Sequence, residues 1–342
     1  KRMNIPVFHD DQHGTAIISS AALLNGLELV GKDIASVKIA VSGAGAAAIA
    51  CLNVMVGLGV KREHIFMVDS KGVIHTGRDN LDESKARYAQ KTEARTLADV
   101  VAGADVFLGC SAPGVLTAEM VKTMGPKPII LALANPEPEI RPELAKAIRP
   151  DCIVATGRSD YPNQVNNVLC FPYIFRGALD CGATTITTSM EIACVHAIAA
   201  LAQAEQSEEV AAAYVGEVLS FGPEYLIPKP FDPRLMLIVA PAVAQAAAEA
   251  GVAKRPIQDM DAYREHLKTF VYASGTMMKP IVHAAKKATK KRVAYAEGEE
   301  ERILRAAQIV VDERIARPTL IGRPAIIAQP IEKFGLRMKE GA

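Results

Sequence analysis

Residues 37–60 read VKIAVSGAGAAAIACLNVMVGLGV, and this stretch decides the fold class. Val37 to Ser42 is a short apolar segment that predicts a buried strand, and Ala46 to Leu58 has the length and apolar content of a helix. His64 to Asp69, with the sequence HIFMVD, predicts a second strand. A strand, a helix and a strand in this order predict a βαβ unit.

The turn between the first strand and the helix carries a glycine motif. Gly43, Gly45 and Ala48 give the pattern G-x-G-x-x-A, in which the glycines permit a tight turn and a close approach of a pyrophosphate to the backbone. Free N–H groups at the helix start would hold the phosphates. We therefore expect cofactor contacts from Gly43, Gly45, Ala46, Ala47 and Ala48. The alternative is that these small residues only pack the helix on the sheet.

The residues after the second strand bear on the choice of cofactor. Asp69 ends that strand, where an acidic residue usually binds the ribose hydroxyls. Its charge would repel a 2′-phosphate and favour NAD, but Ser70, Lys71 and Arg78 follow closely and could hold that phosphate. Asp69, Ser70 and Lys71 are predicted cofactor contacts, and NAD and NADP both stay open with a slight preference for NADP.

Further apolar segments extend the pattern to Val106–Cys110, Ile129–Ala134 and Cys152–Thr156. Helix-length stretches separate most of them, which predicts an α/β fold with a doubly wound, mostly parallel Rossmann-type sheet and helices on both faces, over about residues 18–185. The loops after these strands should then lie along one edge. Ser111, at the first of these strand ends, is a further predicted cofactor contact.

The pattern changes after residue 185. A helical part is predicted over residues 186–289, which completes a first domain of residues 1–289, and a new strand, helix and strand begin near Lys290. Residues 290–342 are too few to bury a core of their own, so they predict the beginning of an incomplete second α/β domain. The opening KRMNIPVF has no start methionine and no features of a signal peptide, and we expect that an upstream part is missing.

Composition narrows the class of function. Half of the 342 residues are apolar. The net charge is +1 and there is no long Lys/Arg block, so the sequence gives no sign of a basic surface that would bind nucleic acid or an anionic membrane. No apolar run reaches the roughly 18 residues that a membrane span needs. The six cysteines have no C-x-x-C spacing and predict reduced thiols in a cytoplasmic protein. Small-molecule chemistry is the expected function.

Polar residues stand at places where a ligand crevice is expected. Asp10 and Asp11 lie in FHDDQHGT, just before a predicted helix at residues 15–27, and could be helix caps or ligands. Asn135 follows the apolar segment IILALA, and Asn166 and Asn167 follow CIVAT. Strand ends converge on the crevice of a doubly wound sheet, although Asn-Pro and Asn-Asn are also turn formers.

Four motifs in this order and at compatible spacing resemble the malic enzymes. They are FHDDQHGTA, the G-A-G-A-A-A turn, LALANPEPE, and the Asn-Asn pair ahead of FPYIFRGALD, and the resemblance covers roughly residues 4–287. RVAYAEGEEERILRAAQ and RPTLIGRP, from Arg292 onward, are similar to the start of a phosphate acetyltransferase domain. Together they resemble the hybrid bacterial malic enzymes.

This resemblance implies oxidative decarboxylation of malate to pyruvate and CO₂ with reduction of NAD(P). By this resemblance Asp11 matches the family's metal-ligating aspartate, and Asp10 matches the acidic residue beside it. Asp10 is expected to share the metal site. Asp10, Asn135 and Asn167 are the residues expected to be catalytic. Asn135 and Asn167 match the asparagines that contact malate, and Asn166, next to Asn167, is also expected to bind the substrate. Asn135 is in addition a predicted cofactor contact. Mg²⁺ or Mn²⁺ suits carboxylate ligands and acts as a Lewis acid. His9 and His13 are expected to be local hydrogen-bonding groups.

The family also draws a tyrosine, a lysine base, a substrate arginine and two further acidic ligands from sequence before the aspartate motif. The fragment alone is therefore expected to be inactive. The resemblance further suggests a homo-oligomer, with acetyl-CoA as an effector at the C-terminal domain. Two alternatives stay open: a non-catalytic nucleotide-binding and assembly module, and an amino-acid dehydrogenase-like oxidoreductase that needs no divalent ion.

Overall fold

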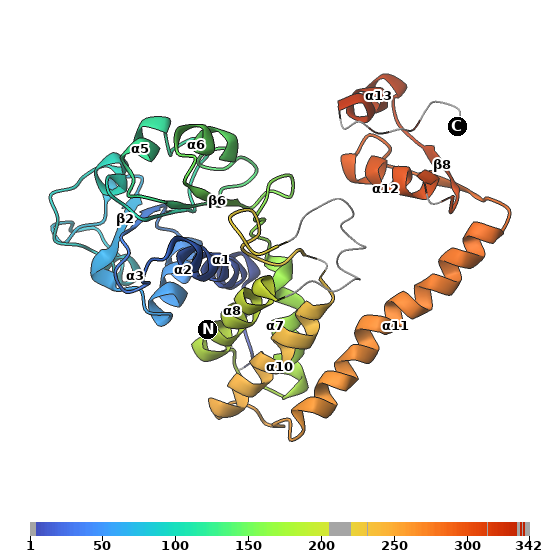
Figure 1. Cartoon of the computed structure of the whole chain (residues 1–342), viewed down its shortest axis with the longest axis horizontal. Helices are drawn as coiled ribbons and strands as arrows, with labels where there is room; N and C mark the ends of the chain where they lie inside the picture. Colours follow the sequence, from blue (N-terminus) through green and yellow to red (C-terminus); the bar gives the residue numbers. More distant parts are fainter. Residues whose placement is uncertain are drawn as a thin grey trace. The chain divides into compact units, whose positions relative to one another are not determined.

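The structure is a computed structural model, which describes residues 5–204, 220–230, 232–312 and 314–333, together with Leu336 and Met338. The chain divides into two compact units, Lys1–Leu267 and Lys268–Ala342 (Figure 1). The division falls within the long helix α11 (Met260–Lys287), whereas the sequence placed the start of the second domain near Lys290. The first strand of the second unit begins close to that position, at Arg292.

The first unit is built on a six-stranded sheet with the strand order β3-β2-β1-β4-β5-β6. All neighbouring pairs are parallel except β2 and β3, where the short edge strand β3 is antiparallel. This confirms the predicted doubly wound sheet. The strands are β1 (Ile39–Ser42), β2 (Ile65–Asp69), β3 (Gly72–Val73), β4 (Val106–Gly109), β5 (Ile129–Ala132) and β6 (Ile153–Thr156).

Helices cover both faces of the sheet, as the continuous apolar runs of the strands require. Successive residues of β1 point to opposite faces, so that Ile39 and Val41 join one buried cluster and Ala40 joins another. The helices that contribute to the first cluster include α1 (Thr15–Val30) and α2 (Ala46–Gly57). Those of the second are α4 (Leu97–Val101), α5 (Ala118–Thr123) and α6 (Pro142–Ile148).

A helical layer extends the first cluster beyond the sheet. Helices α7 (Phe171–Asp180), α8 (Thr188–Gln203) and α10 (Arg234–Glu249) pack on one another, and α8 also packs on α1 (Figure 1). Gly177 allows the close approach of α7 and α10, because a Cβ there would lie 2.4 Å from the carbonyl oxygen of Ala240. The short elements are η1 (Asp10–Gly14), η2 (Arg62–His64), α3 (Glu83–Ala86) and η3 (Asn167–Leu169).

The second unit contains the predicted strand, helix and strand. β7 (Arg292–Tyr295) pairs in parallel with β8 (Arg317–Leu320), and α12 (Glu301–Asp312) connects them. Leu304 and Ala307 of α12 are fully buried, whereas most residues of the two strands are exposed or half-buried. A further helix, α13 (Pro324–Lys333), follows.

Among the residues that the structure describes, no helix has the length and apolar character needed to cross a membrane.

Candidate active site

A pocket of about 620 Å³ lies at the carboxyl ends of the parallel strands of the first unit. Residues from six separate segments meet there, as expected of the ligand crevice in a doubly wound sheet. The predicted site residues at its wall are Asp10, Asp11, Ala47, Ser111, Asn135, Asn166 and Asn167, and the wall also contains Thr15, Cys110, Leu133, Ala134, Gly157, Val165, Val168 and Phe171.

The glycine turn has the geometry that a phosphate-binding turn requires. Gly43 has a φ of 106°, and a Cβ there would lie 2.4 Å from the carbonyl oxygen of Cys110, so only glycine fits. Gly45 is the N-cap of α2, and a Cβ at this position would meet nothing within 4 Å. The backbone of the turn is thus open to a ligand, while Ala48 is fully buried beneath it.

The two aspartates lie in a single π-helical turn, η1, that leads into α1. Neither carboxylate caps these helices, because the N-cap positions are His9 and Gly14 and neither makes a side-chain capping bond. Asp11 is exposed at the pocket wall, whereas Asp10 is half-buried and its Oδ1 is a buried oxygen without a hydrogen-bond partner in the described part of the chain. The carboxylates therefore remain available to a ligand.

The environment of Asp10 explains its electrostatics. Burial raises the pKa of Asp10, the charge of Asp11 adds to the rise, and the Asn167 side chain opposes it. Gly14 is required opposite this carboxylate, because a Cβ there would lie 2.5 Å from Asp10 Oδ1 and 3.1 Å from Asn167 Cβ. A positive ion would relieve the cost of holding two neighbouring carboxylates in a partly buried place.

The adjacent asparagines play different parts. Asn167 Nδ2 donates to the carbonyl oxygen of Asp10 at 3.1 Å, and Asn167 Oδ1 accepts from the Thr15 hydroxyl at 3.3 Å. Asn166 Oδ1 instead accepts from the N–H of Val168 at 3.0 Å and caps η3. Asn166 thus acts as a turn former at the pocket wall, while Asn167 joins its loop to the aspartate turn.

Asn135 is exposed at the end of β5 and reaches the loop after β6. Its amide lies beside Gly157, where a Cβ would be only 3.0 Å from Asn135 Nδ2. The Asn135–Pro136 peptide bond is cis. The structure therefore brings Asn135 to the same pocket as Asn167 and the aspartates, as the sequence predicted.

The donor set at the aspartate turn suits a hard divalent cation. Two carboxylates, one of which has a buried oxygen without a hydrogen-bond partner among the described residues, are ligands of the type that Mg²⁺ and Mn²⁺ take. No cluster of three or more His, Cys, Asp or Glu side chains suited to a metal occurs in the described residues. An ion bound at this turn would therefore need further ligands from elsewhere. His13 Nδ1 accepts from the His9 N–H at 3.0 Å, in agreement with a local role for these histidines.

The predicted contacts at the end of β2 lie outside this pocket. Asp69 receives two hydrogen bonds from the Arg78 guanidinium, both at 2.9 Å, and one from the Lys71 N–H at 2.9 Å, while Ser70 and Lys71 are exposed. Partial burial raises the pKa of Asp69, but these bonds and the charges of Arg78 and Lys85 together hold the pKa below its ordinary value. The predicted cofactor contacts thus lie in three places: the glycine turn after β1, the end of β2 on one side of that turn, and the ends of β4 and β5 on the other.

Glu139, which the sequence did not single out, holds two pocket-lining residues in place. It is fully buried, and its Oε1 accepts from the Ser111 N–H at 2.9 Å and the Ser111 hydroxyl at 3.3 Å, while Oε2 accepts from the Ala134 N–H at 3.1 Å. Gly109 makes room for it, because a Cβ there would lie 2.3 Å from the Glu139 carboxyl carbon. A glycine inside an apolar strand was the available signal, since it often marks a close approach.

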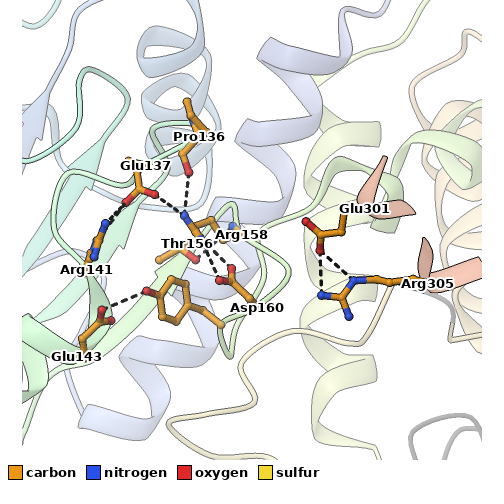
Figure 2. A network of polar contacts seen from close by, with 10 residues as sticks. Pro136, Glu137, Arg141, Glu143, Thr156, Arg158, Asp160, Glu301 and Arg305 are labelled. Carbon is orange, nitrogen blue, oxygen red and sulfur yellow. Dashed lines mark hydrogen bonds and ion pairs between the residues drawn. The ribbon is translucent and has the colours of Figure 1, made fainter. Parts of the chain in front are cut away.

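A second polar network joins the loops after β5 and β6 (Figure 2). Arg158 forms an ion pair with Glu137 at 2.6 Å and with Asp160 at 2.7 Å, and Arg158 Nη1 donates to the carbonyl oxygen of Pro136 at 3.4 Å. Arg141 also pairs with Glu137, at 3.1 Å. These contacts stabilise the solvent-exposed side of the loop that carries Asn135.

Comparisons with known proteins identify the family. The family described as "Malic enzyme, NAD binding domain" matches residues 12–214, which is more than half of the chain. The family described as "Phosphate acetyl/butaryl transferase" matches residues 276–342. The two matches agree with the resemblance drawn from the four motifs and from the segment after Arg292.

Curated relatives and solved structures agree with this. An NAD-dependent malic enzyme of Rhizobium meliloti (strain 1021) is 62% identical over 99% of this chain, and an NADP-dependent malic enzyme of Escherichia coli (strain K12) is 63% identical over 100%. The chain spans 44% and 45% of the lengths of these two relatives.

Among solved structures, the malic enzymes of Entamoeba histolytica and Pyrococcus horikoshii Ot3 are each 36% identical to this chain, both with a TM-score of 0.71. The alignments cover 83% and 82% of this chain and 58% and 64% of those structures. The chain belongs to the malic enzyme family.

Proposed function

We propose that the protein catalyses the metal-dependent oxidative decarboxylation of malate to pyruvate and CO₂ with NAD(P) as the hydride acceptor. The observation that carries this proposal is the pocket in which the aspartate turn, Ala47 at the start of α2 and the asparagine loops meet. The names of the curated relatives support it. Because the chain spans less than half of those relatives, the proposal concerns the whole protein.

The chain's own groups would bind and orient the reactants. Backbone N–H groups of the glycine turn would hold the pyrophosphate, and Asn135 and Asn167 would donate hydrogen bonds to the malate carboxylate or hydroxyl. Asp11 and Asp10 would hold Mg²⁺ or Mn²⁺, which acts as a Lewis acid on the substrate oxygen when bound. Phe171 at the pocket wall would exclude water from the reacting carbons.

The dinucleotide held at the glycine turn would supply the hydride acceptor for C2 of malate, while a base would take the hydroxyl proton. The resulting keto acid would then lose the carboxyl group attached to C3 as CO₂. The pair of electrons left at C3 is then protonated to give pyruvate. We propose that the proton donor and the base come from outside the described residues of this chain, since no tyrosine or lysine lines the pocket. The isolated 342-residue chain should therefore bind the dinucleotide without turning over malate.

We propose that both cofactors are accepted, with NADP slightly preferred. Asp69 would repel a 2′-phosphate, but its charge is paired with Arg78, and Lys85 lies 3.7 Å away. The side chain of Lys71 is exposed beside them. Relatives of nearly equal identity carry the names NAD-dependent and NADP-dependent. A homo-oligomer, and acetyl-CoA as an effector acting on the C-terminal domain, are parts of the same proposal.

The test uses the full-length protein with malate, either dinucleotide and Mn²⁺, and follows dinucleotide reduction. The expected result is reduction that requires malate and stops on chelation. Reduction with glutamate or alanine in place of malate, unaffected by chelation, would support the amino-acid dehydrogenase alternative. The isolated chain is measured beside it, and a chain that binds the dinucleotide without turnover behaves as proposed.

A further inference from the structure

Glu139 differs from the other acidic groups near the pocket in being fully buried while accepting three hydrogen bonds. Two of its three donors are backbone N–H groups, one on each carboxylate oxygen. Both oxygens therefore act as acceptors, as they do in an ionised carboxylate. Burial raises the pKa of Glu139, and the hydrogen bonds from Ser111 and Ala134 oppose that rise. Among the described residues no ion pair to Glu139 is found, so hydrogen-bond donors alone stabilise its charged form.

The hydrogen bonds of Glu139 place this charge directly behind the pocket. Ser111 and Ala134, its partners, both line the cavity, and they belong to the loops after β4 and β5. Ala134 immediately precedes Asn135, so the same carboxylate fixes the start of the Asn135 loop. The charge of Glu139 also contributes, after the effects of Cys51 and burial, to the raised pKa of Cys110, another pocket-lining residue.

The sheet topology indicates which half of a dinucleotide would lie over these loops. The strand order reverses at β1, with β2 on one side and β4 on the other, and the glycine turn follows β1. A pyrophosphate on that turn directs the adenosine half toward Asp69 at the end of β2. The nicotinamide half then extends over the ends of β4 and β5, where Ser111 and Ala134 lie.

We infer that Glu139 is a buried anion behind the nicotinamide half of the site, which positions Ser111 and Ala134 and favours the oxidised cofactor, whose nicotinamide ring is positively charged, over the reduced cofactor, whose ring is neutral. This inference rests on the proposed use of NAD(P). A fixed negative charge in a poorly solvated place stabilises a nearby cation more strongly than the same charge in water. Glu139 is a positioning residue, since it reaches the cofactor through its field and through its partners.

The test measures dissociation constants of the oxidised and reduced dinucleotides by calorimetry on the native protein and on Glu139→Gln, which keeps the side-chain volume and removes the charge. The dissociation constant of the reduced dinucleotide divided by that of the oxidised one should fall by about threefold or more in Glu139→Gln, because the oxidised form loses its favourable partner charge. Glu139→Asp keeps the charge while weakening the hydrogen bonds, so both affinities can fall but the ratio should stay close to the native value. This second variant tests the inference independently if Glu139→Gln does not fold.

Glu137→Gln is the matched control. Glu137 lies two residues away in the same loop, but it is partly exposed and paired with Arg158 and Arg141. Removal of its screened charge should leave the ratio unchanged. An equal loss of both affinities in Glu139→Gln, or a shift in the ratio in Glu139→Asp, would overturn the inference and leave only a structural role. A native protein that binds neither form would overturn the proposed cofactor use and this inference with it.

Discussion

Asn167 Nδ2 donates a 3.1 Å hydrogen bond to the carbonyl oxygen of Asp10, across 157 positions of sequence. The same amide accepts a hydrogen bond from Thr15 through Oδ1. One side chain therefore holds the turn that carries the two carboxylates against the loop after β6. A residue that was expected to contact malate also fixes the position of the carboxylates.

Asn167→Ala should lower both stability and malate use. Loss of the link to Asp10 leaves a partly buried carbonyl without its donor and should reduce the free energy of unfolding by about 1 to 2 kcal/mol. In the full-length protein the KM for malate should rise, because the aspartate turn is no longer fixed. Urea unfolding and steady-state kinetics measure the two effects.

Asn166→Ala provides the control for that change. It removes the cap of η3 and should cost about 1 kcal/mol of stability, but it leaves the link to Asp10 intact. Its KM for malate should therefore rise less than that of Asn167→Ala. Equal KM values in the two variants would contradict the assigned role of Asn167.

Gly14→Ala should disturb the carboxylates without disturbing the dinucleotide. The new Cβ would lie 2.5 Å from Asp10 Oδ1, so this carboxylate has to move. Turnover of the full-length protein at limiting Mn²⁺ should fall, while the dissociation constant for NAD(P) should stay within about twofold of the native value. Gly26→Ala in α1, the helix that follows Gly14, is the control, because its Cβ would meet the flexible end of Ile129 at 3.0 Å, away from the pocket. A similar effect of both changes on turnover would exclude a local role for Gly14.

The structural elements that the sequence predicted are those that depend on local patterns. The strands of the parallel sheet and helix α1 are apolar runs whose length and flanking residues determine the type of element, and all were predicted close to their bounds. The aspartates and asparagines of the motifs line one pocket, because strand order places the ends of β1, β4, β5 and β6 side by side, whereas Gly43, Gly45 and Asp69 do not line it. The strand–helix–strand of the second unit was predicted in the same way.

The pairings inside the site could not be predicted in this way. Glu139 reads as part of a turn, and only the fold returns its side chain to Ser111, 28 positions earlier. Likewise, the aspartates stand just before a helix, where aspartates often act as caps, and only the structure shows that neither forms a capping hydrogen bond. Contacts between side chains that are distant in sequence depend on packing, which hydrophobic periodicity does not encode.

Arg78→Ala should alter cofactor preference. Without the guanidinium, the Asp69 carboxylate loses its bidentate partner and becomes a stronger repulsive charge toward a 2′-phosphate. Affinity for NADP should fall by about tenfold, with a smaller change for NAD. Arg87→Ala, which removes an exposed arginine paired with Glu83, should change neither. A parallel loss of affinity for both dinucleotides would show that Arg78 serves only the local structure.

Hydrogen exchange should distinguish the two units. Amides of β1 and β4 lie in a sheet whose faces are both buried, whereas the residues of β7 and β8 are mostly exposed or half-buried. The amides of β7 and β8 should therefore exchange much faster at low protein concentration. Protection of β7 and β8 equal to that of β1, and independent of concentration, would show that the second unit is stable within one chain.

The metal role of the aspartate turn is tested most directly by Asp11→Asn in the full-length protein, assayed with malate, NAD(P) and Mn²⁺ for pyruvate and for reduced dinucleotide together. The native protein should form the two products in equal amounts. Asp11→Asn should lose both products by about 100-fold or more, while its dissociation constant for the dinucleotide stays near the native value, because the glycine turn lies on a separate segment. Undiminished product formation in Asp11→Asn, or a loss of dinucleotide affinity as large as the loss of turnover, would contradict a metal-assisted site at the aspartate turn.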